Sequence, residues 1–164
     1  MSRTNKNDLR LIAYADVDEA NAHIGAAIAI GDVKPDVAEI LLAIQNDLFD
    51  VGADLCTPLS DDDNRLRITQ EYLDRLESHC DVFNEQLEPL RSFVLPGGTP
   101  AAGLLHVART VTRRAERATW AALDEFGDSM NPLTARYLNR LSDLLFILAR
   151  IANSGDDVLW QPGG

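Results

Sequence analysis

Three arginines, one glutamate and one tryptophan in the second half of the chain are spaced as on one face of a helix. Arg109, Arg113, Glu116, Arg117 and Trp120 fall at i, i+4, i+7, i+8 and i+11, which places them on one face of a helix. Such a face could clamp a polyanion, because guanidinium groups grip oxyanions bidentately, and its acid could hold an arginine in place or help to bind Mg²⁺. The alternative is a solvated face whose arginines pair with acids on neighbouring helices.

A second polar stripe interrupts the most apolar segment of the sequence. It consists of Asn139, Asp143, Phe146, Arg150 and Asn153. Buried polar groups are costly unless they find partners, so this stripe needs either a polar network between subunits or a ligand. Both interpretations stay open at the level of sequence.

The first helical segment carries acids too far along to be explained by the helix dipole. Asp8 suits a helix start, whereas Asp18 lies almost three turns further on and could pair with an arginine elsewhere in an assembly. The three histidines lack metal-ligand spacing, and the sequence contains no nucleophile elbow, Walker loop or Rossmann fingerprint. The residues alone therefore indicate a site for a phosphorylated ligand but do not identify a reaction.

Helical periodicity governs the elements that must position these residues. Apolar residues recur every three or four positions, and Gly, Pro and Thr mark the boundaries. We expect five helices: Leu9–Ile30, one from Pro35 to the break at Thr57 and Pro58, one after Thr69 with an apolar stripe from Tyr72 to Leu87, one from Pro100 to about Phe126, and one from Pro132 to Asn153. No segment alternates as a strand would. The prediction is an all-α, five-helix up-and-down bundle.

Length and charge restrict the function classes. The 164 residues fit a single domain spanning 1–164, and the net charge of −11 argues against a nucleic-acid partner. No segment is long and apolar enough for a membrane span, and the N-terminus lacks a secretory signal. Cys56 and Cys80 fall in apolar stretches, which predicts buried, reduced thiols in a cytoplasmic protein.

Several long motifs, in order, resemble one family. The chain is similar to the ATP:cob(I)alamin adenosyltransferases of the trimeric, propanediol-utilisation type, from about Lys6 to its end. The matching segments are AYADVDEANAHIG (13–25), IQNDLFDVGADLCTP (44–58), FVLPGGTPAAGLLHVARTVTRRAERA (93–118), NPLTARYLNRLSDLLFILARIAN (131–153) and DVLWQPG (157–163).

The resemblance implies a homotrimer of five-helix bundles with active sites at the subunit interfaces. Its members transfer the 5′-deoxyadenosyl group of ATP to the cobalt of reduced cobalamin, with Mg²⁺, and release tripolyphosphate. The nucleophile is Co(I), so no protein nucleophile is expected. Its implied partners are a flavin-type reductase and adenosylcobalamin-dependent enzymes.

The resemblance also assigns roles to residues of the nucleotide site. It implies that Arg109 pairs with Asp18 of a neighbouring subunit and that Arg113 contacts the triphosphate. Lys6 would also reach the phosphates. Glu116 and Asn139 match positions that bind ATP or its Mg²⁺.

Two aromatic residues are assigned to cobalamin. Phe93 matches a phenylalanine on the lower face of the corrin, where it displaces the dimethylbenzimidazole ligand and favours four-coordinate cob(II)alamin. Phe146 is expected to line the same pocket.

The N-terminus departs from the family pattern. Relatives carry a Gly- and Thr-rich segment that cradles the triphosphate, and this chain, which begins MSRTNK, lacks it. Either the segment precedes Met1 in the complete protein, which we expect, or the ATP site has a reduced loop. Two other function classes stay open beside the enzyme: a non-catalytic escort for ATP or cobalamin, and a purely structural bundle.

Overall fold

The computed structural model describes residues 5–61 and 64–164. Over these residues it contains five α-helices, one 3₁₀ turn and, in place of a sheet, a single isolated antiparallel bridge between Val94 and Leu159. The helices are α1 (Leu9–Ile30), α2 (Pro35–Leu55), α3 (Gln70–Asn84), α4 (Pro100–Phe126) and α5 (Leu133–Ala152), and the 3₁₀ turn is η1 (Gly127–Ser129). The predicted all-α class is confirmed.

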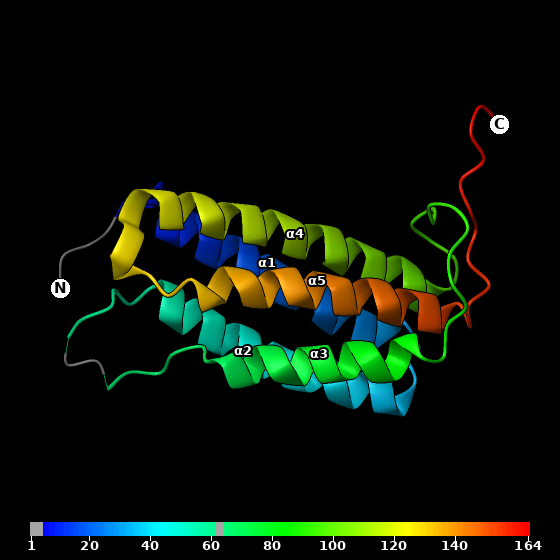
Figure 1. Cartoon of the computed structure of the whole chain (residues 1–164), viewed down its shortest axis with the longest axis horizontal. Coiled ribbons are helices and arrows are strands. Elements are labelled where there is room, and N and C mark those ends of the chain that lie inside the picture. The colour runs from blue at the N-terminus through cyan, green and yellow to red at the C-terminus, as the bar shows by residue number, and fades with distance from the viewer. Residues whose placement is uncertain (1–4, 62–63) are drawn as a thin grey trace.

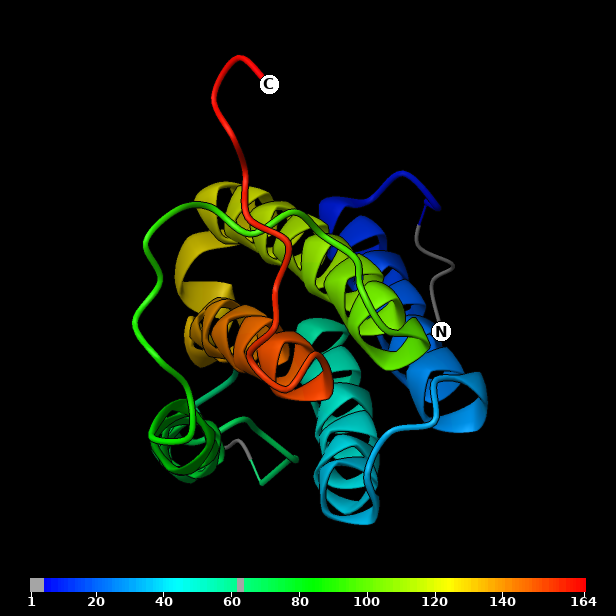
Figure 2. The same ribbon diagram turned by 90° about the vertical axis from the view of Figure 1, so that its right-hand side faces the viewer.

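The five helices run in alternating directions along one long axis (Figure 1). Helix α1 packs against α2 and α4, whereas α5 packs against α4 and α3. The view down the bundle shows α5 among α2, α3 and α4 (Figure 2). The chain therefore forms the predicted up-and-down bundle, with α5 as its central helix.

Helices α1 and α4 each begin with a side-chain cap, and the cap at Thr99 was predicted. The Asp8 side chain accepts a hydrogen bond from the Arg10 N–H at the start of α1, at 2.9 Å. At the start of α4 the Thr99 hydroxyl accepts from the Ala102 N–H, at 3.2 Å, and Pro100 occupies the first turn. Helix α3 ends at Asn84, earlier than its apolar stripe suggests, although Leu87 still packs against the core.

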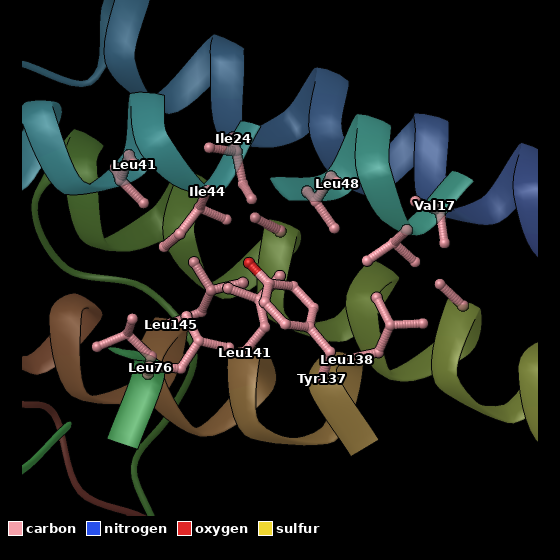
Figure 3. Close-up of a cluster of buried hydrophobic side chains, with 14 of the residues drawn as sticks. Val17, Ile24, Leu41, Ile44, Leu48, Leu76, Tyr137, Leu138, Leu141 and Leu145 are labelled. Carbon is pink, nitrogen blue, oxygen red and sulfur yellow. The ribbon is translucent and has the colours of Figure 1, made fainter. Parts of the chain in front are cut away.

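The core is built around the apolar faces of α5 and its neighbours (Figure 3). Tyr137 of α5 is fully buried, and its hydroxyl donates to the carboxylate of Asp47 on α2, at 3.0 Å. Burial and the adjacent Asp47 carboxylate raise the pKa of Tyr137 well above its ordinary value, so the phenol stays protonated. This hydrogen bond joins two core helices without leaving the buried hydroxyl unpaired.

Two long connections lie at opposite ends of the bundle (Figure 1). We call residues 85–99, which lead from α3 to α4, the crossover, and residues 153–164 the tail. Crossover and tail lie side by side at the end where α5 finishes (Figures 1 and 2). The other connection, residues 56–69, has its described parts, 56–61 and 64–69, at the opposite end.

Two simpler predictions have different outcomes. No helix among the described residues combines the length and apolarity needed to cross a membrane. The prediction of two buried thiols is wrong for Cys56, which is exposed, and Cys80 is half-buried. Cys56 follows the last residue of α2 and so lies just past the turn that its apolar stripe buries.

Candidate functional site

The residues of the arginine stripe of α4 line three different hollows. Arg109 faces an aromatic hollow beside the crossover, and Glu116 and Trp120 face a second one beside α3 and α5. Arg113 and Arg117 border a third, together with Arg114. The stripe that the sequence predicts as one face is therefore divided among neighbouring surfaces.

The aromatic hollow brings together three of the predicted site residues. Phe93 from the crossover, Arg109 from α4 and Phe146 from α5 line a space of about 530 Å³. The Arg109 guanidinium lies 6.0 Å from the centroid of the Phe146 ring, and the Phe93 side chain is 77% exposed. A large exposed aromatic ring beside a cation offers a flat apolar surface for a ligand.

Arg109 has an unusual electrostatic environment. Its Nε–H donates to Nδ1 of His106 at 3.3 Å, and it forms no ion pair within the described part of the chain. Partial burial, and then the nearby Arg113 guanidinium, lower the pKa of Arg109. A partly desolvated cation without an acidic partner favours an anion brought by a ligand or by another chain.

His106 is the hydrogen-bond partner that holds Arg109 in place. The residue is buried, and its ring meets the Phe146 ring edge-on with centroids 6.1 Å apart. Burial, followed by the charge of Arg109, lowers the pKa of His106, which keeps the imidazole neutral and able to accept at Nδ1. Sequence alone gives His106 no role, and the only signal for this contact is its i, i+3 spacing to Arg109.

Glu116 and Asn139, which the resemblance assigns to ATP or its Mg²⁺, lie in contact. The Asn139 side-chain amide donates to Oε1 of Glu116 at 3.2 Å, and the Trp120 indole N–H donates to the same oxygen at 3.3 Å. These contacts fix the Glu116 carboxylate at the edge of the hollow beside α3. Its other oxygen has no hydrogen bond from the described residues and is available to a ligand.

The remaining α4 arginines differ in pairing. Arg114 pairs with Glu19 and lies 3.6 Å from Asp16, both on α1, which is the salt-bridged face of the alternative interpretation. Arg113 and Arg117 are exposed and, within the chain as described, form no ion pair. Among the α4 arginines, Arg109, Arg113 and Arg117 thus lack an acidic partner in the described residues and can bind an external anion.

Asp18 and Lys6 lie apart from the other predicted residues. Asp18 is exposed on α1, beside a small hollow that Tyr14 and Phe49 also line, and it does not contact Arg109 in the same chain. Lys6 is exposed just before α1. One chain therefore gathers Phe93, Arg109 and Phe146 but leaves Asp18 on another surface.

Comparison with known proteins decides the family. A sequence model described as cobalamin adenosyltransferase matches residues 1–152. The chain belongs to this family. Members with similar sequences include the corrinoid adenosyltransferase of Mycobacterium tuberculosis, 60% identical over 166 residues, which cover 100% of this chain and 86% of the relative. The corrinoid adenosyltransferase of Bacillus subtilis is 41% identical over 155 residues, which cover 93% of this chain and 78% of the relative.

Solved structures of the family share the fold. A variant of the PduO-type ATP:corrinoid adenosyltransferase from Lactobacillus reuteri, complexed with cobalamin and ATP, superposes with a TM-score of 0.88 at 37% identity. The match covers 96% of this chain and 89% of that one. This family member is accordingly an enzyme, a corrinoid adenosyltransferase.

Proposed function

We propose that the enzyme transfers the 5′-deoxyadenosyl group of ATP to the cobalt of cob(I)alamin, giving adenosylcobalamin and tripolyphosphate. The observation that carries this proposal is the aromatic hollow. There Arg109, which has no acidic partner in the described chain, lies beside Phe93 and Phe146. Arg113 follows one helical turn later on α4 and is also unpaired in the described chain. An apolar wall for a corrin thus adjoins cations for a triphosphate.

The chemistry needs no nucleophile from the protein. The electron pair of Co(I) forms the bond to C5′ of the ribose while the C5′–O5′ bond breaks, and that bond's electron pair leaves with the tripolyphosphate. Cobalt is formally oxidised from +1 to +3 in this step. The role of Arg113 and Lys6 is to hold the triphosphate and stabilise the charge of the leaving group.

Phe93 and Phe146 act on the cobalamin substrate in this proposal. Phe93, exposed at the mouth of the hollow, covers the lower face of the corrin and displaces the dimethylbenzimidazole ligand. Loss of that ligand makes cob(II)alamin easier to reduce by the single electron that a flavin-type reductase would supply. Adenosylcobalamin-dependent enzymes would then take the product, and the site of action would be the cytoplasm.

The residues fit Mg²⁺ as a nucleotide complex. The described residues contain no group of three acid, histidine or cysteine side chains that could enclose a metal ion. Magnesium is commonly held by one or two carboxylates together with substrate phosphates, and Glu116, oriented by Asn139, offers one such carboxylate. When bound, the ion would neutralise part of the phosphate charge.

The proposed assembly is a homotrimer with shared sites. Asp18 and Arg109 each lack an ion-pair partner within the described chain, and they lie on different surfaces of it. An Asp18–Arg109 pair between neighbouring subunits would neutralise both and complete each site. This pair makes the site depend on assembly.

The decisive experiment combines turnover with complementation. The enzyme, ATP, Mg²⁺ and chemically reduced cobalamin should yield the light-sensitive spectrum of a Co–C bond, and Arg113→Ala should slow this by about 10²-fold. Lack of product from the full-length enzyme would refute the proposal.

Shared sites are tested by mixing two defective variants. Asp18→Asn and Arg109→Gln homotrimers should each be slow, whereas co-refolded mixtures should regain activity because about a quarter of the interfaces join an intact Asp18 to an intact Arg109. Mixtures no faster than either parent, or a monomer in sedimentation, would contradict the shared site.

A further inference from the structure

A buried polar network joins the end of α5 to both the crossover and the tail. The Arg150 Nε–H donates to the Asp157 carboxylate at 2.9 Å, and only 7% and 2% of the two side chains are exposed. A second Arg150 nitrogen donates to the backbone carbonyl of Glu88, also at 2.9 Å. One guanidinium therefore fixes the start of the crossover and a point in the tail together.

Asn153 fixes the other end of the crossover. Its side-chain amide donates to the Gly97 carbonyl at 3.0 Å and to Asp157 at 3.1 Å, and its side-chain oxygen accepts from the Thr99 N–H at 2.9 Å. Gly98 passes so close that a Cβ there would lie 2.3 Å from this oxygen. Its φ of +107° also favours glycine.

The tail pairs with the crossover through the isolated antiparallel bridge between Val94 and Leu159. The Trp160 N–H donates to the Phe93 carbonyl and the Leu95 N–H donates to the Val158 carbonyl, both at 2.8 Å. The Ser92 hydroxyl donates to the Trp160 carbonyl at 2.9 Å. The rings of Phe93 and Trp160 meet edge-on, with centroids 5.9 Å apart.

Phe93 has little else to hold it. Its side chain is largely exposed, so packing against the core contributes little to its position. Its backbone is fixed by the tail, and the tail is fixed by Asp157. The chain of contacts thus runs from the buried pair to the exposed ring without passing through the reacting groups.

We propose that Arg150, Asn153 and Asp157 are positioning residues that set Phe93 at the mouth of the aromatic hollow through the tail. This inference rests on the proposed function, because it gives the network a role through Phe93 in cobalamin binding. It assigns two members of the polar stripe of α5, Arg150 and Asn153, to an internal network, whereas Asn139 and Phe146 line the hollows of the proposed site. The tail is then part of the active-site architecture.

The test compares the same substitution at two buried aspartates, each of which pairs with an arginine. Asp157→Asn removes the carboxylate that holds the tail, and Asp54→Asn removes the carboxylate of the Asp54–Arg67 pair at the opposite end of the bundle. In a Trp120→Phe background Trp160 is the only tryptophan and reports on the tail. Acrylamide quenching of Trp160 should rise about twofold in Asp157→Asn and stay constant in Asp54→Asn.

The second readout separates positioning from stability. In the ATP-loaded enzyme, Asp157→Asn should lower the spectroscopic signal of four-coordinate cob(II)alamin, and the rate from cob(II)alamin should fall about tenfold relative to the rate from chemically reduced cob(I)alamin. Asp157→Glu, which restores a carboxylate, should recover part of both. If Asp157→Asn fails to fold, Ser92→Ala, which removes one hydrogen bond between crossover and tail, should shift both readouts in the same direction.

Three results would overturn the inference: unchanged Trp160 quenching in Asp157→Asn, an unchanged ratio of the two rates, or equal losses in Asp54→Asn. Failure of the proposed function looks different. In that case the wild-type enzyme forms no Co–C bond even from chemically reduced cobalamin, while the Trp160 comparison can still be read.

Discussion

At each end of the bundle a buried aspartate carboxylate paired with an arginine holds a long connection in place, but the two connections differ in what they carry. At one end Asp54 accepts from Arg67 at 2.7 Å, from the Ile68 N–H at 2.8 Å and from the Asn131 amide at 2.7 Å. At the other, Arg150 and Asp157 hold the crossover and the tail. At both ends an Asp–Arg pair fixes the connection.

The difference lies in the residues between the anchor points. The 56–69 connection carries none of the predicted site residues, whereas the crossover carries Phe93. Loss of the first pair should therefore reduce stability alone, and loss of the second should also change how cobalamin is held. A buried ion pair acquires a functional role from the segment it fixes, not from its own chemistry.

The largest expected effect is on stability at the 56–69 end. Asp54→Asn removes a fully buried carboxylate that accepts from Arg67, the Ile68 N–H and Asn131, which should lower the free energy of unfolding by about 3–5 kcal/mol. Denaturant titration measures the loss. Activity per folded molecule should be that of the wild type, and a parallel fall in kcat would break the comparison.

The next effect is on activity at the crossover. Phe93→Ala should slow adenosylation from cob(II)alamin about tenfold while ATP binding is retained, because the ring covers one face of the corrin. Its stability should change by less than about 0.5 kcal/mol, since the side chain is 77% exposed. Leu66→Ala, an exposed apolar residue of the 56–69 connection, is the matched control and should alter neither quantity.

His106, which lies beside Arg109, should make the free energy of unfolding depend on pH. Burial, and then Arg109, lower its pKa in the folded state, while Asp157 opposes this. The stabilisation is therefore present above the ordinary histidine pKa of about 6.5 and is lost as pH falls through the lower folded value, with a slope of at most about 1.4 kcal/mol per pH unit. Unfolding titrations from pH 7.5 to 5 should show this slope in the wild type but not in His106→Gln; equal slopes would argue against a buried neutral imidazole.

The smallest effect concerns thiol reactivity. Burial raises the pKa of Cys80 to about 11, so at pH 8 its thiolate is scarce and alkylation should be slower than at exposed Cys56. Because Cys56 is the first residue of the 56–69 connection, its labelling rate should rise modestly in Asp54→Asn and stay constant in Asp157→Asn. Mass spectrometry of the labelled peptides follows both sites, and a rise in Asp157→Asn would mean that the two ends are coupled.

The helices were predictable because their information is local. Apolar spacing together with Asp8, Thr99 and Pro100 predicts α1 and α4 to the residue at both ends. The aromatic hollow was predicted only as far as the resemblance assigned Phe93 and Phe146. Spacing alone places Arg109 on a face but does not reveal that burial leaves it with His106 rather than an acid.

The pairing of crossover and tail could not be predicted from periodicity. Phe93 and Trp160 are joined by backbone hydrogen bonds between two irregular segments, and such bonds leave no repeating pattern in the sequence. Nor could one chain reveal a partner for Asp18, which lies on a different surface from Arg109. These contacts depend on tertiary or quaternary structure.

The close contact between Gly98 and Asn153 restricts which amino-acid variants position 98 can tolerate. Every missense change of a glycine codon introduces a side chain, and any Cβ at this position would collide with Asn153 and force an unfavourable φ. Selection should therefore remove every amino-acid variant at position 98 about as strictly as variants of a residue that contacts substrate. A comparison of natural sequence variants would then rank position 98 among the essential positions, although glycine has no side chain.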